Sequence, residues 1–249
     1  MSLNWKEIDL ILKELNLNDS FLQEIKQYDY HHLLLQFYGR YGEMTLLISL
    51  QPGALRLHRT ERKRKALPKP PRFTTFLKAR VRGGKCTEVR QISHERIILF
   101  QIIRGGEEFN LYLKLWENSA NIIITDRNGV ILDCFTRRPH RNEVPGQIFQ
   151  PEKDLLSPKK EFDPDRFSIR EISHEEGFNR AIETFYGEKE REQELNRLRL
   201  EAERSLKMEK KRLSGRLDKL KKRLEGYEDF ESYRHSGDLI MANIYRINR

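Results

Sequence analysis

The sequence has little cysteine and no long apolar run. Cys86 and Cys134 lie far apart and lack histidine neighbours at metal-ligand spacing, which argues against a disulfide framework or a zinc site and for a reducing compartment. No apolar run approaches the length that spans a bilayer. Residues 1–17 alternate charged and apolar residues without a signal-peptide core. We therefore expect a cytoplasmic protein with no membrane partner.

Motifs that carry enzyme chemistry are missing as well. Gly83-Gly84 and Gly105-Gly106 are doublets, not a phosphate-cradling loop followed by Lys and Ser or Thr. There is no nucleophile elbow and no helical His-Glu-x-x-His pair, and the seven histidines are scattered. His31 and His32 lie in strand-like sequence without ligand spacing, which favours a structural role. The sequence predicts no catalytic residue, no metal site and no cofactor.

What the sequence does have is an excess of positive charge, because 47 Lys and Arg against 38 Asp and Glu give a formal net charge of +9. Basic residues gather at residues 56–69, 72–85 and 137–141. Such residues on loops supply sequence-independent affinity for nucleic-acid phosphates, although each cluster alone also fits an ordinary solvated surface. The candidate phosphate-binding residues are Arg59, Arg62, Lys63, Arg64, Lys65, Lys78, Arg80, Arg82, Arg137, Arg138 and Arg141, and the first stretch also holds Arg56.

The order of apolar runs and turn signals predicts an α+β domain. Trp5, Ile8, Leu12 and Leu15 recur at helical spacing. Residues 73–82 have the pattern of a short helix that stops at a glycine pair. Short strand-like runs are expected at residues 30–38, 44–50, 97–103, 109–116, 121–125 and 130–135. Strands so closely spaced predict an antiparallel sheet with helices at its edges.

The region from about residue 188 onward has a different pattern. Apolar residues recur among Lys, Arg and Glu at Leu195, Leu198, Ala202, Leu206, Leu213, Leu217, Leu220 and Leu224. This predicts a coiled-coil helix of about four heptads. Its narrow seam needs a partner strand, which self-association would supply. We therefore expect an α+β domain over residues 1–150, a linker or short helical segment over 151–187, and over 188–249 a coiled-coil arm followed by the start of another helical segment.

Short motifs occur in a fixed order along the chain. They are MSLN at residues 1–4, KEL at 13–15, FTTFLKARVRGGK at 73–85, SANIIITD at 119–126 and VPGQ at 144–147. In this order they resemble the N-terminal module of the NFACT proteins, whose bacterial members are called RqcH or, in older naming, fibronectin-binding protein. Residues 233–245 are similar to the stretch that follows the family's first coiled-coil helix. The family's helix-hairpin-helix domain is not recognised, since only residues 153–187 precede the arm.

The resemblance implies a domain related to the N-terminal domain of formamidopyrimidine-DNA glycosylases, with Ser2 in place of their catalytic proline. It also implies an RNA-binding ribosome quality control factor. Such a factor binds tRNA and the stalled large ribosomal subunit with its peptidyl-tRNA, and supports untemplated alanine tailing of the nascent chain. The family's tRNA-reading Asp-Arg pair falls on Glu95 and Arg96, where the acid is one methylene longer. A second family aspartate falls on Asn4, with Asp9 nearby.

The chemistry of Glu95 and Arg96 suits this role, because arginine donates a fork to guanine and a carboxylate accepts from a base amino group. Two other functions stay open. The older family name suggests a cell-surface adhesin for fibronectin or fibrinogen, although no secretion signal or anchor is visible. Kinship of fold suggests a nucleic-acid glycosylase, although no amine replaces the missing proline. The sequence does not specify which tRNA is bound.

Overall fold

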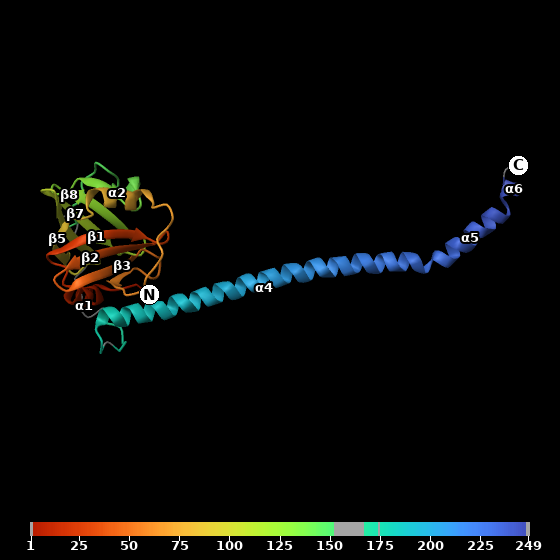
Figure 1. Ribbon diagram of the computed structural model, residues 1–249, viewed down its shortest axis with the longest axis horizontal. Coiled ribbons are helices and arrows are strands. Elements are labelled where there is room, and N and C mark those ends of the chain that lie inside the picture. Colours follow the sequence, from red (N-terminus) through yellow and green to blue (C-terminus); the bar gives the residue numbers. More distant parts are fainter. Residues whose placement is uncertain (1, 152–166, 174, 248–249) are drawn as a thin grey trace. The chain divides into compact units, whose positions relative to one another are not determined.

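The computed structural model describes residues 2–151, 167–173 and 175–247 (Figure 1). Nine strands form one antiparallel sheet in the order β4-β3-β2-β1-β5-β6-β7-β8-β9. They are β1 (Ser20–Gln27), β2 (His32–Gly39), β3 (Gly42–Ser49), β4 (Arg56–Arg59), β5 (Lys85–Gln91), β6 (Ile97–Arg104), β7 (Glu107–Lys114), β8 (Asn121–Asp126) and β9 (Ile131–Cys134). The described helices are α1 (Trp5–Leu15), α2 (Arg72–Arg80), η1 (Pro139–Arg141), α4 (Phe178–Glu228), α5 (Phe230–Ala242) and α6 (Ile244–Ile247). The expected α+β fold, an antiparallel sheet followed by a long helix, is confirmed.

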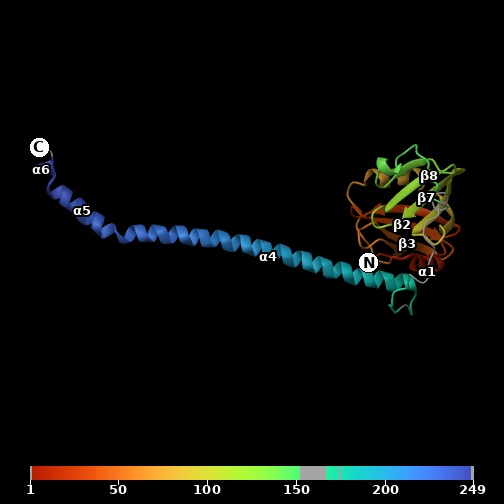
Figure 2. The same cartoon turned by 180° about the vertical axis from the view of Figure 1, so that it is seen from behind.

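The sheet folds back on itself, so that one face of each half encloses the main core. Phe37 of β2 stacks on Phe100 of β6 with ring centroids 6.5 Å apart, although two strands separate β2 and β6 in the sheet. Helix α2 adds Phe73 and Leu77 to this core. Figures 1 and 2 show α1 and α2 at opposite ends of the strand layers. Burial of these apolar faces is the main stabilising contribution to the domain.

A second, smaller core covers the other face of the β6–β9 half. It contains Leu99, Tyr112 and Ile123, and Phe149 closes it with its ring centroid 5.1 Å from that of Tyr112. These strands are therefore apolar on both faces, which explains why they were visible in the sequence as continuous apolar runs. Strands β1, β4 and β5 were not predicted, because polar side chains dominate them.

The sheet domain extends beyond the expected boundary at residue 150. Residues 1–188 form one compact unit and Lys189–Arg249 a second. Helix α4 begins at Phe178, ten residues before the expected start of the arm, and its first turns bury Phe178, Ile182 and Tyr186 in the main core. These three residues recur at a helical spacing of four, a signal that the polar residues around them concealed. Residues 152–166 and residue 174 of the expected linker lie outside the described residues.

Two glutamates of α1 hold this late segment against the sheet. Glu7, 2% exposed, binds the Arg170 guanidinium with Nε–Oε1 and Nη2–Oε2 distances of 2.6 and 3.0 Å. Glu14 accepts hydrogen bonds from the backbone N–H groups of Phe178 (2.6 Å) and Asn179 (2.9 Å). The Glu14 carboxylate thus caps the N-terminus of α4, where unpaired N–H groups and the helix dipole favour an anion.

Both cysteines are free and buried. Burial raises the pKa of the Cys86 thiol to about 12 and, together with the charge of Asp133, that of Cys134 to about 11. Both side chains therefore stay protonated and behave as small apolar groups near neutral pH. Within the part of the chain that the structure describes, no helix is long and apolar enough to cross a membrane.

Substitution of the capping carboxylate tests how α4 is attached. We expect Glu14→Ala to lower the free energy of unfolding by about 1–2 kcal/mol, because two N–H groups and one Asn179 amide lose their acceptor. Urea denaturation followed by circular dichroism measures the change. Glu107→Ala, at the exposed first residue of β7, is the control. Equal stability of the two variants would contradict the capping role.

Buried His58 predicts a loss of stability in mild acid. Burial, and then the positive charges of Arg56, Arg64 and Arg62, hold the pKa of His58 well below its ordinary value. The unfolded chain takes up a proton at this residue below about pH 6.5, whereas the folded chain does not. The free energy of unfolding should therefore fall by up to about 1.4 kcal/mol per pH unit below pH 6.5.

Denaturation curves between pH 5 and 8 measure this slope. His58→Gln should flatten it, whereas His235→Gln, at an exposed position of α5, should leave it unchanged. An unaltered slope in His58→Gln would assign the acid sensitivity to other groups.

Candidate nucleic-acid interface

Glu95 and Arg96 lie in a hydrogen-bonded turn between β5 and β6. Its backbone is closed by hydrogen bonds from Ile92 N to Ile97 O (2.9 Å) and from Glu95 N to Ile92 O (3.2 Å). The Gln91 amide donates to the Glu95 carbonyl at 2.7 Å, and the Arg96 carbonyl accepts from Leu115 N at 2.8 Å. Both candidate side chains are half-buried. The turn therefore presents a carboxylate and a guanidinium from a fixed backbone.

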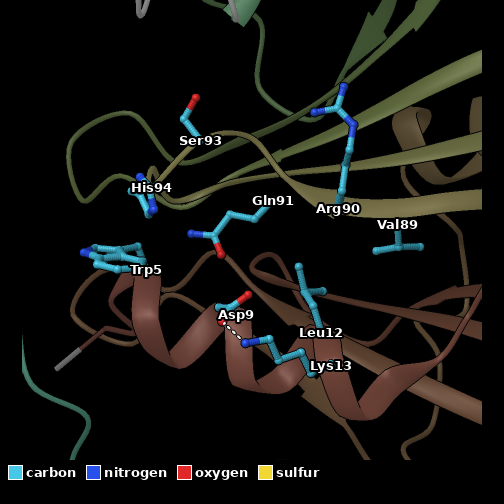
Figure 3. A pocket seen from close by; sticks show the side chains of 9 residues that line it. All are labelled: Trp5, Asp9, Leu12, Lys13, Val89, Arg90, Gln91, Ser93 and His94. Atoms are coloured by element: carbon cyan, nitrogen blue, oxygen red, sulfur yellow. Dashed lines mark ion pairs between the residues drawn. The ribbon is translucent and has the colours of Figure 1, made fainter. Parts of the chain in front are cut away.

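A crevice of about 420 Å³ opens beside this turn, between α1 and β5. Trp5, Asp9, Leu12 and Lys13 line it from the helix, and Val89, Arg90, Gln91, Ser93 and His94 line it from the strand and turn (Figure 3). The Trp5 and His94 rings meet edge to face with centroids 4.8 Å apart. Asp9 and Lys13 form an ion pair at 2.7 Å along the helix. The crevice thus joins two aromatic rings to hydrogen-bonding and charged groups.

Asn4 has a structural role at the start of α1. Its Oδ1 accepts from Glu7 N at 3.1 Å while the Glu7 carboxylate accepts from Asn4 N at 3.0 Å, which is a capping box. Its Nδ2 donates to the Ser168 carbonyl at 2.8 Å. Both ends of the Asn4 amide are therefore engaged within the protein. Asp9, one turn later, points toward the crevice instead (Figure 3).

Ser2 is also engaged. Its hydroxyl donates to Glu117 and accepts from Leu55 N at 2.9 Å. Burial opposes ionisation of Glu117, but the hydrogen bonds from Ser2 and Gly53 and the positive charge of Arg96 outweigh it and lower the pKa of the Glu117 carboxyl. Ser2 occupies the position of the catalytic proline expected from the resemblance to glycosylases. Its hydrogen bonds connect the N-terminus to the β7–β8 turn.

The structure separates the candidate phosphate-binding residues into engaged and open ones. Arg138 bonds to the Ala120 carbonyl and lies 3.5 Å from Glu143. Arg64 stacks on Tyr28, with its guanidinium 4.8 Å from the ring centroid. The other engaged side chains are Arg59 (near Glu61), Arg62 (Glu183), Lys78 and Arg82 (both near Glu24), Arg80 (over Phe76) and Arg137 (Asp133). Lys63, Lys65 and Arg141 are exposed and best placed to meet a polyanion.

Arg56 of the first basic stretch is a core residue. It is 1% exposed, and its guanidinium lies 4.4 Å from the centroid of the Tyr186 ring and donates to the Ala54 carbonyl. The sequence could not separate it from its exposed neighbours, because its partner lies 130 positions away in α4.

Four other basic residues of this stretch line a shallow hollow on the outer face of β1, β2 and β3. The hollow measures about 380 Å³, and Lys26, Arg59, Arg62, Lys63 and Arg64 outnumber Glu43 and Glu61 around it. Side chains from the strands and from the loop after β4 thus form one basic surface. An RNA backbone would meet several cations here at once.

His32 joins Asp29 and Ser49 in an arrangement that has the order of a hydrolase triad. Its Nδ1 lies 2.7 Å from Asp29 Oδ2 and its Nε2 lies 3.0 Å from Ser49 Oγ. Ser49, however, is 0% exposed, so no substrate reaches its hydroxyl. The three side chains connect the β1–β2 loop to the end of β3, which is a structural role. Among the described residues, no group of three His, Cys, Asp or Glu is placed to hold a metal ion.

Comparison with known proteins gives a family. The sequence profile of the NFACT N-terminal and middle domains matches residues 8–173 and 157–249, most of the chain. The chain belongs to the NFACT family. A curated NFACT-family relative, the Rqc2 homolog RqcH of Bacillus subtilis (strain 168), is 27% identical over 160 residues. That alignment spans 59% of this chain and 28% of the relative, so this NFACT chain matches less than a third of the relative's length.

Three solved structures share the fold of this NFACT chain. The N-terminal part of the fibronectin/fibrinogen-binding protein of Streptococcus suis is 20% identical, has a TM-score of 0.56, and covers 59% of this chain and 60% of its own. The N-terminal domain of fibronectin-binding protein PavA of Streptococcus pneumoniae is 19% identical, with a TM-score of 0.57 and coverages of 68% and 65%. The fibrinogen binding protein of Staphylococcus aureus is 20% identical, with a TM-score of 0.54 and coverages of 74% and 81%. Likeness at this level of identity extends to the fold alone.

Sequence reasoning missed Trp5 and Gln91. Trp5 was interpreted as one of four apolar positions on α1, and its half-buried ring instead forms the end of the crevice next to His94. The available signal was its place in the first turn of the helix, directly after the N-cap, where a large apolar side chain often lies outside the core. Gln91 carried no recognisable signal, because its role depends on the shape of the turn.

The division into engaged and open cations predicts which substitutions weaken RNA binding. We expect Lys63→Gln with Lys65→Gln to lower affinity for any RNA and to reduce the slope of log K against log salt by about 0.7–0.9 per lost phosphate contact. Filter binding of tRNA and of an unstructured RNA between 50 and 300 mM salt measures both. Lys78→Gln is the control, since Glu24 lies 3.0 Å from this ammonium already. An unchanged slope in the double variant would exclude this loop from the interface.

Proposed function

We propose that this chain is an RNA-binding factor of ribosome quality control. In this proposal it binds tRNA and the stalled large ribosomal subunit with its peptidyl-tRNA, and supports untemplated alanine tailing of the nascent chain. Peptide-bond formation belongs to the ribosome, so the chain needs no catalytic residue of its own. The factor works where ribosomes translate, in the cytoplasm. Membership of the NFACT family and a curated relative named as an Rqc2 homolog support this choice of pathway.

The observation that carries the proposal is the hydrogen-bonded Glu95-Arg96 turn beside a crevice with aromatic walls. Single-stranded bases of a folded RNA are recognised by stacking on aromatic side chains and by hydrogen bonds to their edges. Trp5 and His94 offer ring faces and edges, and Asp9, Lys13 and Arg90 offer donors and acceptors. Arg96 and Glu95, from the adjoining turn, would select the base by its exposed edge.

Glu95 is one methylene longer than the aspartate of the family's Asp-Arg pair, so its carboxylate reaches farther. It accepts the same hydrogen bonds as an aspartate. In the proposed contact, Glu95 receives an amino group of a base and Arg96 donates to a guanine or to a phosphate. Asn4 lies outside this contact, since its amide is committed to the α1 cap and to Ser168. Asp9, on the crevice wall, is the acid of α1 that meets the ligand.

Removal of Arg96 tests the proposed site. We expect Arg96→Ala to lower the preference for tRNA over an unstructured RNA of equal length by about 10-fold or more, because a bidentate contact contributes about 1–3 kcal/mol of discrimination. Trp5→Leu should weaken tRNA binding by a similar amount through loss of stacking. Competition binding with purified chain measures both preferences.

The matched control is Arg127→Ala. Arg127 is an exposed arginine in the β8–β9 turn. Because the strands are antiparallel, that turn lies at the opposite end of the strands from Arg96. Equal tRNA preference in wild type, Arg96→Ala and Trp5→Leu would refute the proposed tRNA-binding site. Crosslinking of RNA to the protein in cells tests ribosome binding and tRNA selection separately. Recovery of ribosomal RNA without tRNA would support binding to the ribosome and refute tRNA selection by this site.

A further inference from the structure

Large apolar side chains form a row across the outer face of neighbouring strands in the sheet domain. Tyr38 of β2 lies directly opposite Phe21 of β1. Phe21 is in turn opposite Lys85 of β5, and Lys85 is opposite Ile103 of β6. Tyr38, Phe21 and Ile103 are 53%, 47% and 41% exposed. Exposed apolar residues that are scattered singly are ordinary, but three in one row form a patch of the kind that marks a binding surface.

A β-bulge places this row and the shallow basic hollow on the same face. Phe21 and Glu24 are three residues apart and would point to opposite faces of a regular strand. The bulge between Leu22 and Glu24 removes this alternation, and Glu24 pairs with Gln36. Gln36 lines the hollow and lies two residues before Tyr38, on the same face of β2. Because β1, β2 and β3 lie side by side (Figure 1), the row and the hollow form one continuous surface.

The charges of this surface suit a polyanion. Around the hollow, the acids Glu43 and Glu61 are outnumbered by Lys26, Arg59, Arg62, Lys63 and Arg64. Glu24, between the hollow and the apolar row, is offset by two cations, since Lys78 lies 3.0 Å and Arg82 3.8 Å from its carboxylate. The potential over the face is therefore positive, and it attracts a negatively charged partner.

The exposed rings indicate the chemical class of this partner. A base of unpaired RNA exposes a flat face that stacks on an aromatic ring, while its phosphates meet neighbouring cations. In a duplex each base face is covered by the next base pair, so that Phe21 and Tyr38 would have no base to stack on. Gln36 and Thr45, from the floor of the hollow, offer uncharged hydrogen-bonding groups for the edges of bases. This combination of rings, polar groups and cations suits a single strand better than a duplex.

We propose that the outer face of β1, β2 and β3 binds unpaired RNA, with bases stacked on Phe21 and Tyr38 and the backbone held by the cations around the hollow. The proposal rests on the proposed function in taking RNA as the polyanion. It adds a second contact, because among the described residues none lines both this hollow and the crevice between α1 and β5. The chain then holds a folded RNA at the crevice and an unpaired segment on the sheet face.

Binding of a fluorescent oligouridine to the full chain tests the proposal, with an RNA duplex of equal length for comparison. We expect Phe21→Thr and Tyr38→Thr each to weaken binding of the single strand by about 5-fold or more, because each removes one stacking surface. Both variants should bind the duplex as the wild type does. Tyr38→Phe keeps the ring and should bind both RNAs normally. Threonine suits a strand, so unfolding followed by circular dichroism should be unchanged.

Two control variants separate stacking from charge. Tyr30→Thr removes a ring that is 82% exposed in the β1–β2 loop, at the other end of the strands from Phe21 and Tyr38, and should leave binding unchanged. Lys26→Gln with Lys63→Gln removes two cations of the hollow and should weaken binding of the single strand and of the duplex alike.

Wild-type affinity for oligouridine in both Phe21→Thr and Tyr38→Thr would overturn the proposal. A poly-aspartate peptide that displaces oligouridine and loses affinity in the same two variants would also overturn it, in favour of an acidic protein partner. Arg96→Ala distinguishes this failure from failure of the crevice. If the ring variants bind normally while Arg96→Ala still lowers the tRNA preference, the sheet-face proposal fails and the proposed function stands. The reverse pattern refutes the crevice and supports the sheet face.

Discussion

The buried carboxylate of Glu7 is the contact on which the arrangement of the sheet domain depends. It completes the cap of α1 through Asn4 and at the same time binds the guanidinium and the backbone N–H of Arg170. Arg170 in turn lies over the rings of Phe185 and Tyr186 in α4. One side chain therefore fixes the start of α1, the returning segment and the first turns of α4, and through α1 it fixes one wall of the crevice. A buried ion pair of this kind is costly to break, because either partner alone would be left charged without a counterion.

The parts of the fold that the sequence made predictable are those whose side chains face apolar surroundings on both sides. Strands β6 to β8 have this character, and their predicted and observed bounds differ by two residues or fewer. Strand β5 was missed because most of its side chains are only half-buried and most of them are charged or polar. Strand β4 was not predicted because it lies in a basic stretch. Its first residue, Arg56, is buried against Tyr186, and only the tertiary fold brings these two residues together.

The candidate site divides in the same way. The position of Glu95 and Arg96 in a turn before a buried strand followed from local pattern, as did the presence of basic clusters. Which cations stay open could not be predicted, because engagement depends on carboxylates and rings that are distant in sequence, such as Glu183 for Arg62. The crevice itself was beyond reach from sequence, since its walls belong to α1 and β5, which only the fold brings together. Helical periodicity did predict the long helix α4, because the spacing of apolar residues along one helix is a local feature of the sequence.

Gly187 leaves room for one cation of the basic loop, Arg62, to lie against α4. A Cβ at this position of α4 would overlap the guanidinium of Arg62, which rests against the bare glycine backbone near Glu183. The clash involves the end of a long, flexible side chain, so a small substituent would displace Arg62 and leave the core intact. An alanine at position 187 would move this guanidinium, already 46% exposed, away from α4 and from Glu183 while the composition in charged residues stays the same. The position of one positive charge of this loop thus depends on Gly187, an uncharged residue of α4.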